Sequence, residues 1–130
     1  ARSLERMADH AQQMAMLIIE DNGQTKLPIE NAPLNQIPIW QEAIRTLMIN
    51  IRTKDPIEIE SARIALKTAQ DYLSKHERGL WSGRKNAPKL LFEDHISESI
   101  RRLCAYSRDF GETLLNMLTH EMMVTERIQN

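Results

Sequence analysis

Hydrophobic residues recur at intervals of three and four positions along most of this chain, which is the spacing of helices that bury one face. The pattern predicts four helices, over residues of about 1–21, 37–53, 56–79 and 88–126. No segment shows the sustained alternation of polar and apolar residues that is typical of a strand. We therefore expect an all-α protein, folded as an antiparallel bundle of four helices.

Each predicted helix carries an apolar stripe that we expect to face a shared core. In the first helix the stripe has heptad spacing, at Leu4, Met7, Ala11, Met14 and Ile18. The inward positions of the other three helices are Trp40, Ile44, Leu47 and Ile51; Ala62, Ala65, Ala69, Tyr72 and His76; and Phe92, Ile96, Ile100, Leu103, Phe110, Leu114 and Leu118.

Glycine, proline and capping residues mark the ends of these helices. Asn22-Gly23 offers the left-handed conformation that ends the first helix, and three prolines make residues 24–38 an extended connection. Asp55-Pro56-Ile57-Glu58 predicts a helix start, with Asp55 as N-cap and Glu58 reaching back to it. A turn from Gly79 to Pro88 separates the last two helices.

Composition narrows the function classes. The 17 basic and 18 acidic side chains leave a formal net charge of −1, so no overall field attracts nucleic acid. The longest apolar run, Met14 to Ile19, is far shorter than the roughly 20 residues that span a bilayer. The single cysteine, Cys104, fits a reducing compartment. We expect a cytoplasmic protein with no direct nucleic-acid binding and no membrane insertion.

Residues 3–19 have a degenerate copy in residues 99–115, each 96 positions after its counterpart (99 − 3). We name residues 99–115 the echo. Only Ser3/Ser99 and Arg6/Arg102 are identical, and what repeats is the order of large and small apolar residues. The matching pairs are Leu4/Ile100, Met7/Leu103, Ala8/Cys104, Ala11/Ser107, Met14/Phe110, Ala15/Gly111 and Ile18/Leu114. Such a repeat predicts two duplicated helices in equivalent surroundings.

The segment Leu4-Glu5-Arg6-Met7-Ala8-Asp9-His10-Ala11 resembles the signature of the PhoU family of phosphate-uptake regulators, especially its archaeal members. In that family an acid-x-x-x-Asp motif followed by His-Ala lies on the helix that closes each of two three-helix repeats. The resemblance implies that residues 1–22 are the last helix of a first repeat, residues 23–36 a linker, and residues 37–130 the second repeat. The chain is then expected to be the C-terminal part of a longer protein.

The resemblance also implies a function. Proteins similar to PhoU are not enzymes; they bind metal clusters on the acidic motifs and restrain phosphate import. They do so by contacting the phosphate ABC transporter and, in bacteria, a sensor kinase. For this chain the resemblance implies a non-enzymatic regulator of phosphate homeostasis, with iron, zinc or another divalent ion on Glu5 and Asp9. Because the echo carries Arg101 and Ala105 at the corresponding positions, we expect no second metal site there.

The residues themselves allow two interpretations of Glu5 and Asp9. Their spacing of four projects both carboxylates from one helical face, and hard cations need such convergent oxygens. Alternatively, Arg2 and Arg6 each stand three residues before one of these acids and pair with them on a solvated face.

For the remaining candidate groups we favour structural roles. Asp94 and Glu98 fit the helix dipole at the start of the last helix, and Cys104 fits core packing. His76 lies on an apolar stripe, so we expect a satisfied, partly buried imidazole. The basic residues around Trp81 form a solvated turn or a patch for an acidic partner or a phosphate group; they are Lys75, Arg78, Arg84, Lys85 and Lys89.

Two further expectations follow from these patterns. The alternative to a phosphate regulator is a metal-free helical scaffold, or a histidine-phosphotransfer-like signalling bundle that uses His76. We also expect a homodimer through the first helix, because a first repeat without its other helices leaves apolar side chains uncovered. These side chains are Met7, Met14, Met16 and Ile19.

Overall fold

The computed structural model describes residues 2–21, 23, 25–82 and 87–129, and within them it contains four α-helices and no strand. The elements in chain order are α1 (Arg2–Asp21), the 3₁₀ helix η1 (Leu34–Gln36), α2 (Ile37–Thr53), α3 (Pro56–Leu80) and α4 (Ala87–Gln129). The predicted all-α four-helix bundle is confirmed, and the predicted helix ends differ by at most three residues, at the end of α4. None of the described helices combines the length and the apolar character that a membrane span requires.

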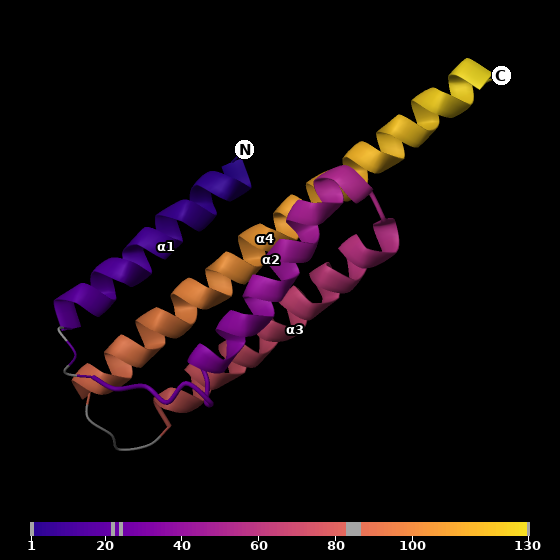
Figure 1. The fold of residues 1–130 in the computed structure, drawn as a ribbon. Coiled ribbons are helices and arrows are strands. Elements are labelled where there is room, and N and C mark those ends of the chain that lie inside the picture. The colour runs from indigo at the N-terminus through magenta and orange to yellow at the C-terminus, as the bar shows by residue number, and fades with distance from the viewer. Residues whose placement is uncertain (1, 22, 24, 83–86, 130) are drawn as a thin grey trace.

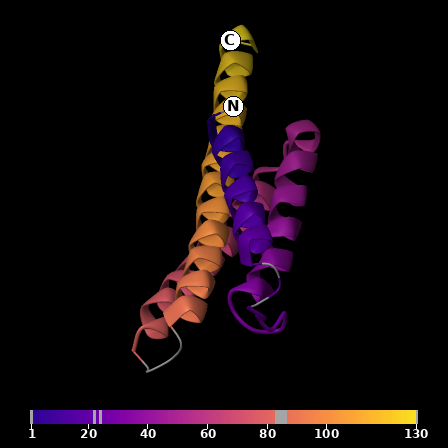
Figure 2. The same cartoon turned by 90° about the vertical axis from the view of Figure 1, so that its left-hand side faces the viewer.

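The helices run in alternating directions, and α4 lies between α1 and the pair formed by α2 and α3 (Figure 1). Helix α4 packs against the other three helices, and α3 also packs against α2. Helix α1 packs on α4 and makes almost no contact with α2 or α3. Because α4 has 43 residues and α3 only 25, the C-terminal end of α4 continues past the bundle in both views (Figures 1 and 2).

The core lies where α2, α3 and α4 meet. Its fully buried aliphatic side chains are Leu47, Ile59, Leu66, Leu73, Ile96 and Ile100. The stripe predicted for α4 is confirmed, whereas the inward prediction was wrong for Ile51 and Tyr72, which are 49% and 45% exposed. On α3 the buried line passes through Leu66 and Leu73, because leucines fill the space between two neighbouring helices.

The buried stripe of α1 differs in part from the prediction. Met7 is 7% exposed and Met14 is partly buried, as predicted, but Ile18 is 55% exposed. His10 and Leu17 turn inward instead, while Ala11 is exposed. Both lines obey heptad spacing, and the position of α4 selects the one that brings Met14 and Leu17 against the core.

Asp55 caps α3 as predicted. Its Oδ1 accepts hydrogen bonds from the N–H groups of Ile57 at 2.9 Å and Glu58 at 3.4 Å. The predicted return bond from Glu58 was wrong, because the Asp55 N–H donates to Oδ1 of Asn50 at 2.8 Å. Asn50 is 1% exposed, and its amide nitrogen also donates to the carbonyl of Thr46 at 2.9 Å. A buried amide of α2 thus holds the turn into α3.

Helix α1 ends at Asp21, whose carboxylate accepts hydrogen bonds from the N–H and the hydroxyl of Thr25, both at 2.7 Å. Gly23 has a φ of 74°, the left-handed conformation predicted for this helix end. Asn22 lies outside the described residues, as do Arg84 and Lys85 of the predicted basic turn.

Candidate functional site: the interface of α1 and α4

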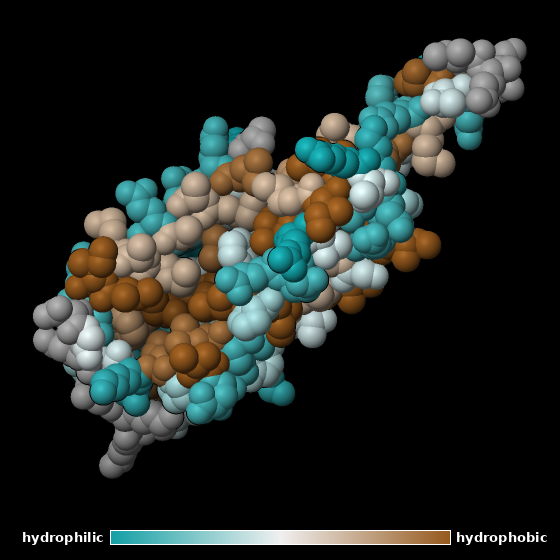
Figure 3. Space-filling model, in the orientation of Figure 1, coloured by the Kyte–Doolittle hydropathy of each residue, from teal (hydrophilic) through white to brown (hydrophobic). Residues whose placement is uncertain are grey.

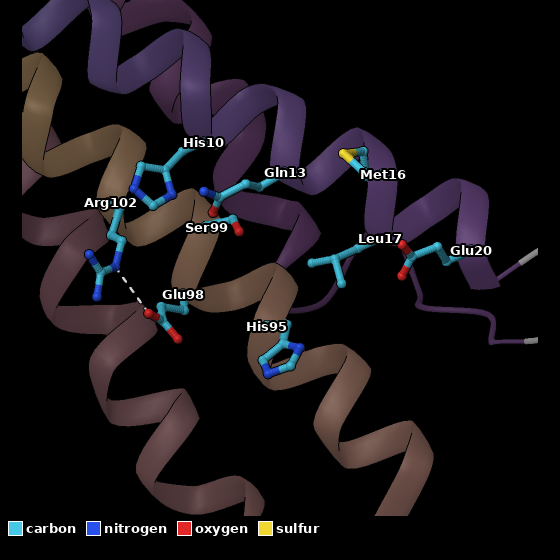
Figure 4. A pocket seen from close by; sticks show the side chains of 9 residues that line it. All are labelled: His10, Gln13, Met16, Leu17, Glu20, His95, Glu98, Ser99 and Arg102. Atoms are coloured by element: carbon cyan, nitrogen blue, oxygen red, sulfur yellow. Dashed lines mark hydrogen bonds and ion pairs between the residues drawn. The ribbon is translucent and has the colours of Figure 1, made fainter.

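A cleft of about 360 Å³ lies between α1 and α4. Its lining comprises His10, Gln13, Met16, Leu17 and Glu20 from α1, and His95, Glu98, Ser99 and Arg102 from α4 (Figure 4). His10, Arg102 and Glu98 form one end of the cleft, which we name the polar end, and Leu17 and Glu20 lie toward the other end. The cleft thus combines imidazole, guanidinium and carboxylate groups from two helices.

Stacked side chains hold the polar end together. The rings of His10 and Tyr106 lie with centroids 5.4 Å apart and planes tilted by 31°. The guanidinium of Arg6 lies 5.5 Å from the centroid of the Tyr106 ring, within the range of a cation–π contact. Arg102 pairs with Glu98 at 3.0 Å and lies beside His10. The contacts of His10 and Arg6 with Tyr106 join α1 to α4.

The pKa of His10 is lowered from its ordinary value of 6.5. Burial is the main cause, because it disfavours the imidazolium, and repulsion by the Arg102 cation adds to it. The carboxylates of Glu98 and Asp9 act in the opposite direction. The Nδ1 atom of His10 is buried and has no hydrogen-bond partner among the described residues. The site therefore favours a neutral imidazole.

The echo relates these contacts in pairs. Tyr106 is the counterpart of His10, and Arg102 is the counterpart of Arg6. Arg6 packs on Tyr106 while Arg102 lies beside His10, so exchanging each residue for its counterpart exchanges the two contacts. The two contacts therefore correspond to each other through the echo, between the antiparallel helices α1 and α4.

The outer faces of the two related helices have different surroundings. Ala8, Ala11, Ala15 and Ile18 of α1 are exposed. Their counterparts Cys104, Ser107, Gly111 and Leu114 of α4 are buried. The expectation of equivalent surroundings was therefore wrong on this side, because α2 and α3 cover α4 and no described element covers α1 in the same way.

Glu5 and Asp9 are both exposed on α1. Arg6, one of their two candidate partners, packs on Tyr106. In the described part of the chain no three His, Cys, Asp or Glu side chains converge to hold a metal ion. Two carboxylates from one helix therefore need further oxygen ligands, from water or from another molecule, to hold a hard cation.

The helix-dipole interpretation of Asp94 and Glu98 was wrong. Helix α4 begins at Ala87, so both acids lie beyond the first turn, where the dipole effect fades. Glu98 is instead neutralised by Arg102, one turn further along the same helix.

His76 and Cys104 occupy structural positions. The side chain of His76 is 23% exposed, and its Nε2 lies 3.7 Å from Oε2 of Glu93, so partial burial is confirmed but a hydrogen bond is lacking. Cys104 is 0% exposed, and desolvation raises the pKa of its thiol to about 12. A buried neutral thiol of this kind is packing, as predicted.

One polar cluster was missed by sequence reasoning. Glu77 of α3 is 14% exposed and accepts hydrogen bonds from Ser97 and Arg101 of α4, each at 3.0 Å. Arg101 stands at the echo position of Glu5. The replacement of the acid Glu5 by the basic Arg101 in the echo was the signal from which this contact between α3 and α4 could have been found.

The uncovered surface predicted for α1 was partly wrong. Met7 lies 3.0 Å from the hydroxyl of Ser107, and Met14 packs against the core. Met16 and Ile19 are 52% and 74% exposed, as predicted. Met7 and Met14 turn inward because they lie on the line of α1 that faces α4.

Comparisons of the chain with protein-family models, with curated proteins and with solved structures found no match in any of the three. The resemblance to the PhoU family therefore rests on the segment Leu4 to Ala11 of α1.

Proposed function

We propose that this chain is a non-enzymatic, cytoplasmic regulator of phosphate uptake that acts through protein contacts, as its resemblance to the PhoU family implies. The observation that supports the proposal most is that α1 packs against its echo in α4, with Arg6 and His10 in contact with Tyr106, the counterpart of His10. Two repeats that each close with such a helix would meet at a junction of this kind.

Helix α1 is the element through which such a regulator would respond. It is held by α4 with almost no support from α2 or α3, and Glu5 and Asp9 lie exposed on it. A partner that binds these carboxylates would shift α1 against α4 through the contacts of Arg6 and His10 with Tyr106. The partners implied by the resemblance are components of the phosphate ABC transporter and, in a bacterium, a sensor kinase.

The metal proposal concerns Glu5 and Asp9 alone. We propose that they bind iron, zinc or another divalent ion, which would link α1 to oxygen ligands outside the helix. Elemental analysis and titration of the wild type and of Glu5→Ala/Asp9→Ala test this. Asp109→Ala/Glu112→Ala, which removes two exposed acids of α4, is the matched control. Equal metal content in all three proteins would show that Glu5 and Asp9 do not bind the metal.

The regulatory proposal is tested in the native host. Deletion of the parent gene should alter phosphate import or stored polyphosphate, and the wild-type gene should restore both. Unchanged uptake under phosphate-rich and phosphate-starved growth would favour the scaffold alternative. A complementing gene with Glu5→Ala/Asp9→Ala separates the contribution of the acids from that of the fold.

The phosphotransfer alternative requires His76 to accept a phosphoryl group. This imidazole is 23% exposed, and the carboxylate of Glu93 lies 3.7 Å away, where it would repel an incoming phosphate. Both observations argue against phosphorylation of His76 and so favour the regulator over the phosphotransfer alternative. Incubation with a small phosphodonor, followed by detection of phosphohistidine in the wild type and in His76→Gln, distinguishes the two. Stoichiometric labelling that His76→Gln abolishes would establish the alternative.

A further inference from the structure

A groove of about 580 Å³ lies between α2 and α3, and no described residue of α1 or α4 lines it. Small side chains form its floor, which consists of Ala43 of α2 with Ala62 and Ala65 of α3. Ala43 and Ala62 are 4% and 6% exposed. Hydrophobic side chains also gather between α1 and α2 (Figure 3), and the groove lies on the other side of α2, toward α3.

Isoleucine side chains stand at the two ends of this groove. Ile39, in the first turn of α2, is 39% exposed, and Ile57, in the first turn of α3, is 77% exposed. Because α2 and α3 run in opposite directions, their first turns lie at opposite ends of the helix pair (Figure 1). The groove therefore has an exposed branched side chain at each end and alanines between them.

The apolar character extends past the groove along both helices. Ile49, Ile64 and Tyr72 are 51%, 59% and 45% exposed. Each of them follows a residue that lines the groove by seven positions, about two helical turns, so it lies on the same side of its helix. We name the groove together with these three residues the α2–α3 face. An exposed apolar patch of this extent is typical of an interaction surface.

The α2–α3 face carries little charge. Glu42 and Glu58 are the acids that line the groove, and Arg45 lies 4.0 Å from Glu42 at its edge. Two acids and one base leave a net charge of −1 (1 − 2). The core of a protein interface is depleted in charged residues in the same way. A face of this composition neither repels a copy of itself nor selects a strongly charged partner.

The shape and the area of the face also suit a second copy. A two-fold interface must be complementary to itself, because the same surface forms both of its sides. The α2–α3 face has both parts that this requires, since isoleucines project from it beside a groove floored by alanines. Helix α2 is about 25 Å long, and two packed helices are about 20 Å across, so two such faces bury on the order of 1,000 Å², the area at which specific interfaces begin.

We propose that the α2–α3 face of one copy binds the same face of a second copy about a two-fold axis, with the isoleucines of each copy packed against the groove of the other. The α2 and α3 helices of the two copies then form a contact of four helices. The dimer forms through these helices and not through the first helix, which the sequence pattern predicted. Helix α1 contributes no residue to the contact, and the contact is independent of the phosphate regulation proposed above.

Sedimentation analysis of purified protein, from about 1 μM to several hundred micromolar, tests this assembly. We expect the wild type to dimerise and Ile39→Glu and Ile57→Glu each to weaken association at least tenfold. Both changes place an acid in the first turn of a helix, which the helix dipole favours, so the fold should persist. Met48→Glu is the matched control and should dimerise like the wild type. Met48 is 47% exposed on α2 but lies about 200° around the helix from Thr46, which lines the groove. Circular dichroism and melting temperature verify that each variant is folded.

Chemical labelling identifies the face that the dimer covers. Ser61 lines the groove and is exposed in the single copy. Ser61→Cys should react with a maleimide at least tenfold more slowly at a protein concentration well above the dissociation constant than at one well below it, whereas Met48→Cys should react equally at both. The native Cys104 is 0% exposed and does not contribute.

Two results would overturn the proposal. One is a wild type that stays monomeric throughout the concentration range. The other is a dimer that Ile57→Glu leaves unchanged, or in which Ser61→Cys reacts at the same rate at both concentrations, since another surface would then form the contact.

Discussion

Replacing Ser107 by alanine should lower the free energy of unfolding by about 1–2 kcal/mol, the cost of orphaning one hydrogen-bond donor. Ser107 is 0% exposed, and its hydroxyl accepts a hydrogen bond from Nε1 of Trp40 at 2.8 Å. The hydroxyl donates to the carbonyl of Leu103 at 2.7 Å and lies 3.0 Å from Sδ of Met7. Side chains of α1, α2 and α4 therefore meet at one oxygen atom.

The magnitude follows from what remains after the substitution. The indole N–H of Trp40 loses its acceptor, and an unsatisfied donor of this kind costs about 1–3 kcal/mol. Alanine offsets about 0.5 kcal/mol of this loss in stability, because it is a better helix former than serine. Urea unfolding followed by circular dichroism measures the difference, and an unchanged dependence on urea concentration shows that the unfolded states are comparable.

A double-mutant cycle isolates the hydrogen bond from the loss of packing. Trp40→Phe removes the donor and keeps most of the ring, so Ser107→Ala should cost at least about 1 kcal/mol less in that background than in the wild type. Equal costs in the two backgrounds would refute the reasoning, because Ser107 would then act without Trp40.

Three further predictions concern single side chains. Because the pKa of His10 is lowered from 6.5 in the folded protein, the unfolded chain binds this proton more readily. The contribution of His10 to the free energy of unfolding is thus complete above about pH 6.5 and is lost as the pH falls toward the folded pKa. His10→Gln should remove this part of the pH dependence of the urea midpoint. A pH dependence that the substitution leaves unchanged would contradict the lowered pKa. Asp55→Ala should cost about 1 kcal/mol through the lost cap and Asp55→Asn much less, so equal losses in thermal unfolding would assign the effect to charge. Cys104, buried and with a pKa of about 12, should react with iodoacetamide only on unfolding, and rapid labelling of the native protein would show that its burial is wrong.

The helices could be predicted because their signals are local. Asp55 and Pro56 start α3, and Gly23 follows α1, through residues that act within one turn of the helix end. The inward line of α1 could not be predicted in the same way. Two heptad lines, one through Ala11 and Ile18 and one through His10 and Leu17, satisfy the sequence pattern equally, and only the position of α4 selects between them.

The polar contacts that join α2 and α3 to α4 also depend on tertiary structure. Trp40 and Ser107 are 67 positions apart, and Glu77 and Arg101 are 24 positions apart. No spacing rule connects residues on different helices, so their pairing follows only once the helices are in register. The acid motif is the opposite case, because Glu5 and Asp9 lie on one helix and their place on a shared face follows from spacing alone.

The echo places one pattern of large and small residues in two different environments, buried on α4 and exposed on α1. On α4 the positions of Cys104, Ser107, Gly111 and Leu114 are buried under α2 and α3, and they include a hydroxyl that is hydrogen-bonded across helices. On α1 the corresponding four positions carry three alanines and Ile18, with no group that could make such a bond and no charge that would favour water. Exposure of this face forgoes the free energy of burial, which for a large aliphatic side chain such as Ile18 is about 1.5–3 kcal/mol. A helix packed on this face of α1 would recover that free energy, as α2 and α3 do on the corresponding face of α4.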